Sequence, residues 1–454
     1  MTRPFRRVAA VLAALLVALL ANLSWVQVFE ADALRQHPGN TRTVLEQFNR
    51  ARGPIIVGSA PIATSSRAGA DGFYQRSYVD GPLYAAITGY YSLLYGATGI
   101  ERSQDGVLSG TDPRFFVDRV QQLFAGRHQA GGAVTLSVDA IAQQAAFDAL
   151  AGTQGATVAL DARTGAILAL VSTPSFDPQT LAPNDPARVR AAYARLTADA
   201  AQPLENRAVG VARPTGTAFQ LVTTAAALAS GHYSGETVLP APARLAGVRT
   251  VNARPCTANG RTTLTAALRS GCATAFAAVG TGLGVDAVRT MAERLGYDTT
   301  PSPELGTVPS TLTPGTDVAH LAALGTGADA TVLQLAMLAA MVANGGTLMD
   351  PYIVQDVRAQ DLAVLDHAKP SVRATVLSHR NATALARMLQ GIDGSTTCAE
   401  CTVAGTPVHA LTGGPGWFVG YAGHIAVATV VQSGTGTATA GAIPVLRAIL
   451  ARSR

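Results

Sequence analysis

Four cysteines carry the most reactive side chains of the sequence, and their spacing limits their chemistry. Cys256 and Cys272 lie far from the single Cys-x-x-Cys motif formed by Cys398 and Cys401. Zinc binding is disfavoured, because there is no second such motif and no pair of histidines at metal-binding spacing. Four cysteines allow three disulfide pairings, of which two local pairs are the simplest. We predict a bond between Cys256 and Cys272, whose loop of about 16 residues would contribute up to ~3 kcal/mol by chain entropy.

Amine chemistry is restricted to one position, because Lys369 is the only lysine among the 34 basic residues. The arginines are scattered rather than gathered in a basic stripe, so we expect no nucleic-acid partner. Charged residues make up 14% of the chain and hydrophobic residues 48%. This composition is the reverse of that of disordered proteins, and it indicates a chain that buries a large core.

The N-terminus indicates the compartment. Arg3, Arg6 and Arg7 precede an apolar run from Val8 to Ala21, which extends to Phe29 and approaches the ~20 residues that span a membrane. Basic residues stay on the cytoplasmic side, so the rest of the chain is expected outside the cytoplasm. A cleaved signal peptide is the alternative, although no clean cleavage site follows. We predict that residues 1–29 form a cytoplasmic tail and a signal anchor of a single-pass protein of the cell membrane.

Two regions follow the anchor. Residues 30–130 contain a polar spacer and short apolar runs broken by Gly, Ser and Asp, which is typical of a small α+β module. The glycine-rich stretch 126–132 predicts a domain boundary at about residue 130. Residues 131–454 form the second and larger region.

The larger region has strand patterns at both of its ends. Residues 156–160 and 166–171 are two apolar runs joined by a glycine-containing turn, which predicts a β-hairpin. Residues 417–421 and 425–431 predict two more strands, and helical patterns lie between at Ala218–Ala229, Leu264–Val279, Val285–Leu295 and Val332–Val342. This order indicates an antiparallel sheet closed by the first and last strands, with a helical insert.

Six segments keep the order and spacing of a known family: Gly155–Ser172, Asn206–Ala208, Pro214–Thr224, Gly325–Gly327, Ala343–Gly346 and Trp417–Ala422. Together they resemble the transpeptidase domain of class B penicillin-binding proteins. The segments Gly81–Tyr84 and Tyr95–Glu101 are similar to the actinobacterial penicillin-binding protein A group. The resemblance implies an α+β fold with a penicillin-binding/β-lactamase-like transpeptidase domain, an antiparallel sheet with helices. This domain would follow the membrane anchor and a smaller α+β dimerisation-type module.

The resemblance places the family's Ser-x-x-Lys pair on Thr217 and Gln220. In such a pair the lysine amine takes the proton of the serine hydroxyl, which then attacks the D-Ala-D-Ala carbonyl of a stem peptide or a β-lactam. Thr217 keeps a hydroxyl, although its β-branch restricts the rotamer. Gln220 cannot act as a base, because an amide neither gains nor loses a proton near neutral pH.

The two other family motifs are also degenerate. Ser-x-Asn falls on Gly271, Cys272 and Ala273, with Ser270 one residue early as a weak substitute. Lys-Thr-Gly falls by alignment on Thr406, Pro407 and Val408. His409 is a further candidate base, but a lone histidine on a strand is more often structural. No Ser-x-x-Lys or Lys-Thr-Gly exists anywhere, because Lys369 follows Asp366 and precedes Pro370-Ser371.

We therefore expect a membrane-anchored penicillin-binding protein homologue in cell-wall assembly, a pseudoenzyme that acts as a binding or scaffold protein in processes such as cell division. Its partners would be the peptidoglycan stem peptide or other cell-wall assembly proteins. No cofactor and no metal are expected. The alternative is an active D,D-transpeptidase acylated by penicillin through Thr217, and a third hypothesis is a pocket altered for a different ligand.

Overall fold

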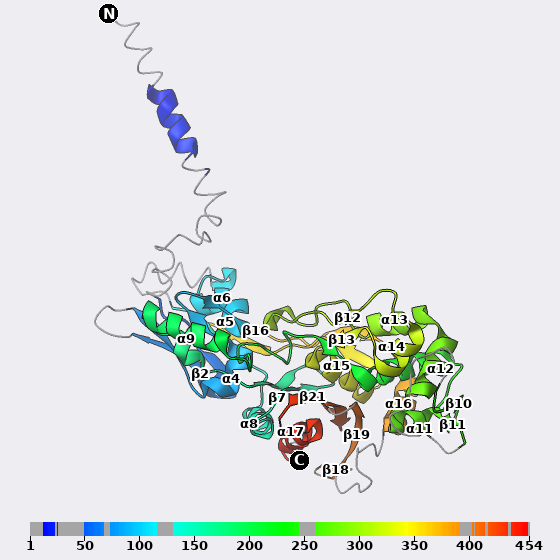
Figure 1. The fold of residues 1–454 in the computed structure, drawn as a ribbon. Coiled ribbons are helices and arrows are strands. Elements are labelled where there is room, and N and C mark those ends of the chain that lie inside the picture. Colours follow the sequence, from blue (N-terminus) through cyan, green and yellow to red (C-terminus); the bar gives the residue numbers. More distant parts are fainter. Residues whose placement is uncertain are drawn as a thin grey trace, which may run out of the picture.

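The computed structural model describes residues 12–22, 25, 50–67, 73–115, 130–244, 256, 259–389, 402–403, 405–413, 416–434 and 437–452. Figure 1 shows the early elements (blue to cyan) at one end of the molecule and the helices of the middle of the chain (green to yellow) at the other. A β-sheet that contains β7 and β21 lies between them.

This central sheet has six antiparallel strands in the order β18-β19-β20-β21-β7-β8. Their bounds are β7 Gln154–Asp161, β8 Ile167–Thr173, β18 Thr402–Val403, β19 Thr406–Gly413, β20 Trp417–Ala422 and β21 Ile425–Ser433. The expected hairpin is formed by β7 and β8, and β21 pairs with β7 along its length. The predicted closure of the sheet by its first and last strands is confirmed.

Alternating side chains of the central sheet face two different helical layers. Val158 and Leu160 belong to the core that includes α15 (Val332–Ala343). Ala159 between them belongs to a second core with α8 (Ala140–Ala149) and α17 (Ala438–Leu450). Because successive side chains of a strand point to opposite faces, both faces of this sheet are buried by helices.

A second six-stranded sheet, in the order β16-β15-β6-β1-β2-β3, joins distant parts of the chain. Its strands are β1 Ile55–Val57, β2 Ala60–Arg67, β3 Tyr74–Tyr78, β6 Ala133–Leu136, β15 Val354–Arg358 and β16 Val364–His367. The pair β1–β6 is parallel, whereas β15 pairs antiparallel with β6. The N-terminal module and the region after residue 130 thus share one sheet.

Short strands and further helices complete the described fold. The short strands are β4 Tyr91–Ser92, β5 Gly96–Ala97, β9 Arg213–Pro214, β10 Val238–Pro240, β11 Arg261–Thr263, β12 Thr311–Leu312, β13 Ala328–Ala330, β14 Thr347–Met349 and β17 Val372–Thr375. The helices are α4 Gly81–Thr88, α5 Gly99–Ser103, α6 Asp105–Ser109, α9 Pro186–Ala198, α10 Gln220–Ser230, α11 Leu264–Ser270, α12 Ala273–Leu283, α13 Val285–Arg294, α14 Val318–Leu324 and α16 His379–Leu389. The 3₁₀ turns are η1 Pro113–Phe115, η2 Pro178–Leu181, η3 Gly216–Phe219 and η4 Pro303–Leu305.

One expected helix is in fact two helices. The pattern of Leu264–Val279 predicts a single element, but α11 ends at Ser270 and α12 begins at Ala273. Gly271 adopts a left-handed conformation with φ of 65° and accommodates the end of α11. The expectation of one continuous helix is therefore wrong at this glycine.

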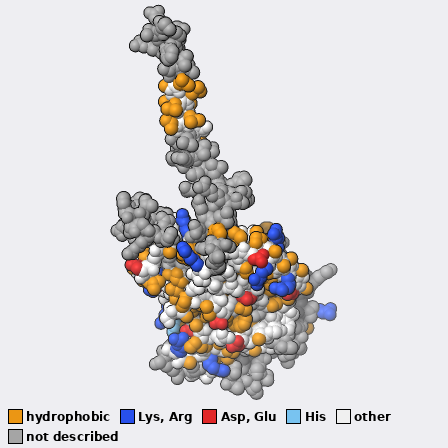
Figure 2. Space-filling model, turned by 90° about the vertical axis from the view of Figure 1, so that its left-hand side faces the viewer, with side chains coloured by type: hydrophobic (Ala, Val, Ile, Leu, Met, Phe, Trp, Pro, Cys, Tyr) orange, Lys and Arg blue, Asp and Glu red, His pale blue; other side chains and the backbone are white. Residues whose placement is uncertain are grey.

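The described N-terminal residues 12–22 are helical and apolar. Their leucines are exposed, and Figure 2 shows them as an orange cluster on the stalk above the folded body. Among the described residues, no helix is both long and apolar enough to cross a membrane.

Candidate functional site

Thr217 lies in the turn η3, directly before α10, and lines a cavity of about 590 Å³. Arg213, Leu324, Trp417 and Gln432 are among the other lining residues. Thr217 is half-buried, and its hydroxyl makes no hydrogen bond to any described residue. The expected nucleophile position thus presents a free hydroxyl to a cavity.

Contacts with three elements, β13, β20 and α14, hold this turn. The backbone N–H and the hydroxyl of Thr215 both donate to the carbonyl of Ala328, at 3.0 and 3.1 Å. The indole Nε1 of Trp417 donates to the carbonyl of Pro214 at 3.2 Å. Gly325, with φ of 61°, ends α14, and a Cβ there would collide with Thr215 and Gly216. The expected glycine segment is therefore required for close packing beneath the turn.

Gln220 is fully buried and serves the end of α14 rather than Thr217. Its Nε2 donates to the carbonyl of Ala323 at 2.8 Å, and Thr223 donates to the carbonyl of Ala322 at 3.1 Å. These carbonyls belong to the last turn of a helix, where intrahelical donors are missing. The Oε1 of Gln220 is buried without a hydrogen bond among the described residues. The backbone N–H of Gln220 donates to the carbonyl of Thr217, but among the described contacts the Gln220 side chain makes no hydrogen bond to the Thr217 hydroxyl. The position expected to hold the base therefore supports a neighbouring helix.

Arg213 is a functional candidate that the sequence did not single out. Its Nη2 pairs with Glu205 Oε1 at 2.7 Å, and its guanidinium also faces Gln432, whose amide oxygen fits the role of acceptor. Arg213 lines the same cavity as Thr217. One indication of this role was visible in the sequence, because Arg213 directly precedes Pro214-Thr-Gly216. In the structure, a single residue separates β9, which contains Arg213, from η3. The cavity therefore contains a cation in addition to the hydroxyl.

The second motif supplies no polar side chain at its expected positions. Gly271 ends α11, and Ala273 is the buried first residue of α12. Cys272 between them forms the predicted disulfide with Cys256. Ser270 is exposed, and its hydroxyl donates to the carbonyl of Ala266 at 2.8 Å, within its own helix. Ser270 thus forms a local contact of the kind that a helical serine makes without any ligand.

The residues that the resemblance aligned with the third motif lie away from the Thr217 turn. Thr406 pairs with Val403 of β18 and lies near the turn at Gly423. The opposite end of β19 pairs Gly413 with Trp417, next to the turn that carries Thr217. Thr406 and Gly413 are seven residues apart, which corresponds to about 23 Å along a strand. Thr406 is therefore not among the lining residues of the Thr217 cavity.

Leu411, Thr412 and Gly413 form the strand end beside the turn η3. This tripeptide keeps the Thr-Gly of the family motif, with leucine in place of the lysine. Leu411 is buried in the same core as Ala218 and Phe219 of η3. Sequence alone does not decide between this tripeptide and the alignment that starts from Ala404-Gly405.

His409 has a structural environment. Its Nδ1 lies 2.9 Å from the carbonyl of Ala386, and its ring stacks on Tyr421 with centroids 4.8 Å apart. Burial raises the pKa of Tyr421 to about 12, so this phenol stays protonated. Neither side chain lines the Thr217 cavity. Metal-binding clusters of three or more His, Cys, Asp or Glu are absent among the described residues, while Cys398 and Cys401 lie outside them.

Family comparisons cover most of the chain. Residues 155–451 match the penicillin binding protein transpeptidase domain, and residues 52–134 match the penicillin binding protein A dimerisation domain. The first match begins within β7, and the second ends within β6.

Full-length relatives and solved structures agree with these matches. The chain is 35% identical to the peptidoglycan D,D-transpeptidase PbpA of Mycolicibacterium smegmatis, over 99% of both chains. It is 34% identical to PbpA of Mycobacterium tuberculosis, over 99% of this chain and 98% of the relative. The penicillin G acyl-enzyme complex of penicillin-binding protein A from M. tuberculosis superposes with a TM-score of 0.81 at 33% identity, covering 89% of this chain and 99% of that one.

Proposed function

Because this chain belongs to the family of penicillin-binding proteins with a transpeptidase domain, we propose that it acts in cell-wall assembly without transferring acyl groups. Membership of the family, in the penicillin-binding protein A group, supports a role in peptidoglycan synthesis. The finer proposal is a binding or scaffold protein that engages the peptidoglycan stem peptide or other assembly proteins. In this proposal residues 1–29 anchor the protein in the cell membrane.

The environment of Gln220 is the observation that carries this proposal. A hydroxyl becomes a competent nucleophile only when a neighbouring group accepts its proton. The amide of Gln220 has no such capacity, and its hydrogen bond to Ala323 turns it toward α14. Arg213 cannot replace it, because a guanidinium stays protonated in proteins. Relatives in this family that form acyl-enzymes show that the fold can support acylation. Whether this chain is acylated depends on the residues of its own site.

The test is incubation of the purified protein with a fluorescent penicillin, followed by denaturing electrophoresis. We expect no covalent band for the wild-type chain or for Thr217→Ala. Thr197→Ala, on the exposed surface of α9, is the matched control. A covalent band that is lost in Thr217→Ala but kept in Thr197→Ala would refute the proposal.

A specific observation favours the alternative of a penicillin-acylated transpeptidase. The hydroxyl of Thr217 is free and lines an open cavity, so attack is not blocked by an existing hydrogen bond. The same electrophoresis distinguishes the two functions. Acylation within minutes would indicate catalytic competence, and its absence after hours would leave binding as the function.

Binding without chemistry has its own test. Co-sedimentation with purified insoluble peptidoglycan should be retained by Thr217→Ala and reduced several-fold by Arg213→Gln, because Arg213 supplies the cation of the cavity. Arg195→Gln, an exposed arginine of α9 outside the cavity, should sediment like the wild type. Equal sedimentation of Arg213→Gln would assign the interaction to a different surface.

The membrane location is tested by fractionation of cells. The full chain should be in the membrane fraction, and a variant without residues 1–29 should be released from it. Retention of the truncated protein in membranes would contradict an N-terminal anchor.

A further inference from the structure

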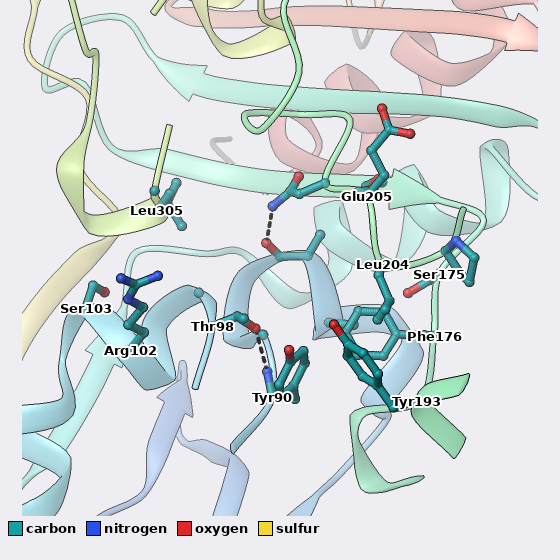
Figure 3. Close-up of a pocket in the computed structure, with 18 residues that line it drawn as sticks. Tyr90, Thr98, Arg102, Ser103, Ser175, Phe176, Tyr193, Leu204, Glu205 and Leu305 are labelled. Atoms are coloured by element: carbon teal, nitrogen blue, oxygen red, sulfur yellow. Dashed lines mark hydrogen bonds between the residues drawn. The ribbon is translucent and has the colours of Figure 1, made fainter. Parts of the chain in front are cut away.

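A larger cavity, of about 790 Å³, lies between the N-terminal module and the transpeptidase domain. The module contributes α4 and α5, and the other wall comprises the segment after β8, α9 and residues 203–206. Figure 3 shows Arg102 and Ser103 on one side of it and Phe176, Tyr193 and Leu204 on the other. Sites for small ligands commonly have this size and lie at domain interfaces.

Tyr90 places an unpartnered polar group in this cavity. Its side chain is 8% exposed, and its hydroxyl has no hydrogen-bond partner among the described residues. Burial, followed by the nearby Tyr193 and Tyr95, raises the pKa of Tyr90, so the hydroxyl remains a proton donor. The hydroxyl lines the cavity without a described acceptor, so it is available to donate to an acceptor atom of a ligand.

The aromatic rings around this hydroxyl pack against one another. Tyr90 packs edge-to-face against Phe176, with centroids 6.2 Å apart, and Tyr193 stacks on Tyr95 at 3.8 Å. In Figure 3 the hydroxyl ends of Tyr90 and Tyr193 point in the same direction. The rings therefore present their hydroxyl groups to a ligand rather than open faces. This arrangement disfavours a sugar, which would have to stack on a ring face.

The charge in the cavity is unbalanced. Arg102 is exposed and forms no ion pair with any described residue. Glu205 is the other charged lining residue, and its carboxylate is already paired with Arg213 at 2.7 Å and with Arg207 at 3.3 Å. The cavity thus retains one guanidinium available for a carboxylate, a group that arginine binds in a bidentate manner.

We propose that this cavity binds a small acidic peptide. The guanidinium of Arg102 pairs with a side-chain carboxylate of the peptide, and the hydroxyl of Tyr90 donates to one of its oxygens. The apolar wall at Phe176 and Leu204 packs against the remainder of the peptide. This site is separate from the Thr217 cavity, with which it shares no lining residue.

Isothermal titration calorimetry on the full chain tests the proposal with two matched probes, N-acetyl-Ala-Glu-amide and N-acetyl-Ala-Gln-amide. The glutamate peptide should bind saturably and about tenfold more tightly than the glutamine peptide, because only the former carries a charge. Arg102→Gln should weaken binding of the glutamate peptide about tenfold, and Tyr90→Phe should weaken it several-fold. Arg195→Gln is the control for net charge and should bind like the wild type.

Three results would overturn the proposal. They are absence of saturable binding up to 10 mM peptide, equal affinity for the two peptides, and unchanged affinity in Arg102→Gln with circular dichroism showing a native fold. Loss of binding in Trp417→Ala alone would place the peptide in the Thr217 cavity and also contradict it. The outcome is independent of penicillin acylation, so this proposal and the proposed function fail separately.

Discussion

At the scale of single residues, the glutamine at position 220 maintains the local packing, although its amide cannot accept a proton from Thr217. Its amide retains a donor for the carbonyl of Ala323, so the end of α14 stays satisfied. A lysine ammonium at this position would also donate there, but only the lysine can lose a proton. An amide at this position can therefore satisfy the packing at the end of α14 without offering a proton acceptor.

Restoring single residues should not restore acylation, because nucleophile and base act as a unit. Thr217→Ser should remain inert toward fluorescent penicillin. Thr217→Ser with Gln220→Lys should react slowly or not at all, since the lysine needs a lowered proton affinity that other polar groups of the site normally provide. The measurement is the acylation rate of each variant. Rapid acylation of Thr217→Ser alone would reveal a base that the structure does not show.

The two candidate positions for the third motif give a second prediction. Starting from the double variant with Ala273→Asn, addition of Leu411→Lys should raise the acylation rate at least tenfold, whereas Thr406→Lys should not. Leu411 lies beside the turn η3, and Thr406 lies at the far end of β19. Penicillin labelling of the two matched variants decides it, with circular dichroism confirming that the buried lysine is tolerated. A larger gain from Thr406→Lys would contradict the strand register.

Glu101 forms a buried ionic interaction with two arginines in the N-terminal module. Its two carboxylate oxygens pair with Arg52 at 2.5 Å and with Arg76 at 2.6 Å, and it is fully buried. Burial alone would raise the pKa of Glu101, but Arg76 and Arg52 outweigh it and lower the pKa below its ordinary value of 4.5. Because the folded-state pKa is the lower one, the stabilisation is present above pH 4.5 and is lost as the pH falls.

Glu101→Gln should lower the free energy of unfolding at pH 7 by roughly 3–5 kcal/mol, because it leaves two buried guanidinium groups without their carboxylate. It should also flatten the loss of stability below pH 4.5. Urea unfolding at pH 7 and at pH 4 measures both effects. Asp105→Asn is the control, since the Asp105 side chain is 49% exposed and its pair with Arg52 should contribute about 1 kcal/mol or less. Equal effects of the two substitutions would contradict the assignment.

At the scale of elements, Gly325 couples the end of α14 to the turn that carries Thr217. Gly325→Ala should lower stability by more than about 1 kcal/mol, because it adds a collision with Thr215 to the cost of a left-handed residue. Gly315→Ala is the matched control, since Gly315 also has a positive φ of 74° but open space around a Cβ. Thermal unfolding of both variants separates the collision from the conformational cost. A Gly325→Ala protein as stable as Gly315→Ala would exclude the close contact.

At the scale of the whole molecule, the shared sheet makes the two regions interdependent. Strand β6 lies between β1 of the module and β15 of the later region. Ile55 and Val57 of β1 belong to the core that extends through the transpeptidase domain. Removal of the module would therefore expose a sheet edge together with apolar surface, which favours aggregation.

A chain of residues 131–454 should aggregate or unfold without cooperativity, whereas a chain of residues 50–454 should remain monomeric and unfold in one transition. Size-exclusion chromatography and thermal circular dichroism compare the two. A monomeric 131–454 chain with the same transition midpoint would show that the boundary at residue 130 separates independent domains.

The sequence by itself determined the features that depend on residue type and short-range order. Short apolar runs bounded by turn residues predicted β7, β8, β20 and β21, because such runs are typical of strands that are buried on both faces. The single lysine excluded the lysine-dependent motifs, since composition does not depend on folding. Local spacing was also sufficient to favour the Cys256–Cys272 pairing, which the structure contains.

Only the tertiary structure decided features that depend on which distant segments meet. The end of β19 that lies beside Thr217 follows from its pairing with β20, and a shift in alignment along one strand cannot be judged without that partner. The direction of Gln220 depends on carbonyls about a hundred residues later, at the end of α14. The cavity around Tyr90 and Arg102 is lined by α5 of the module and α9 of the later region, which are about a hundred residues apart in sequence. Such juxtapositions arise from packing, for which the spacing of residues along the chain carries no direct signal.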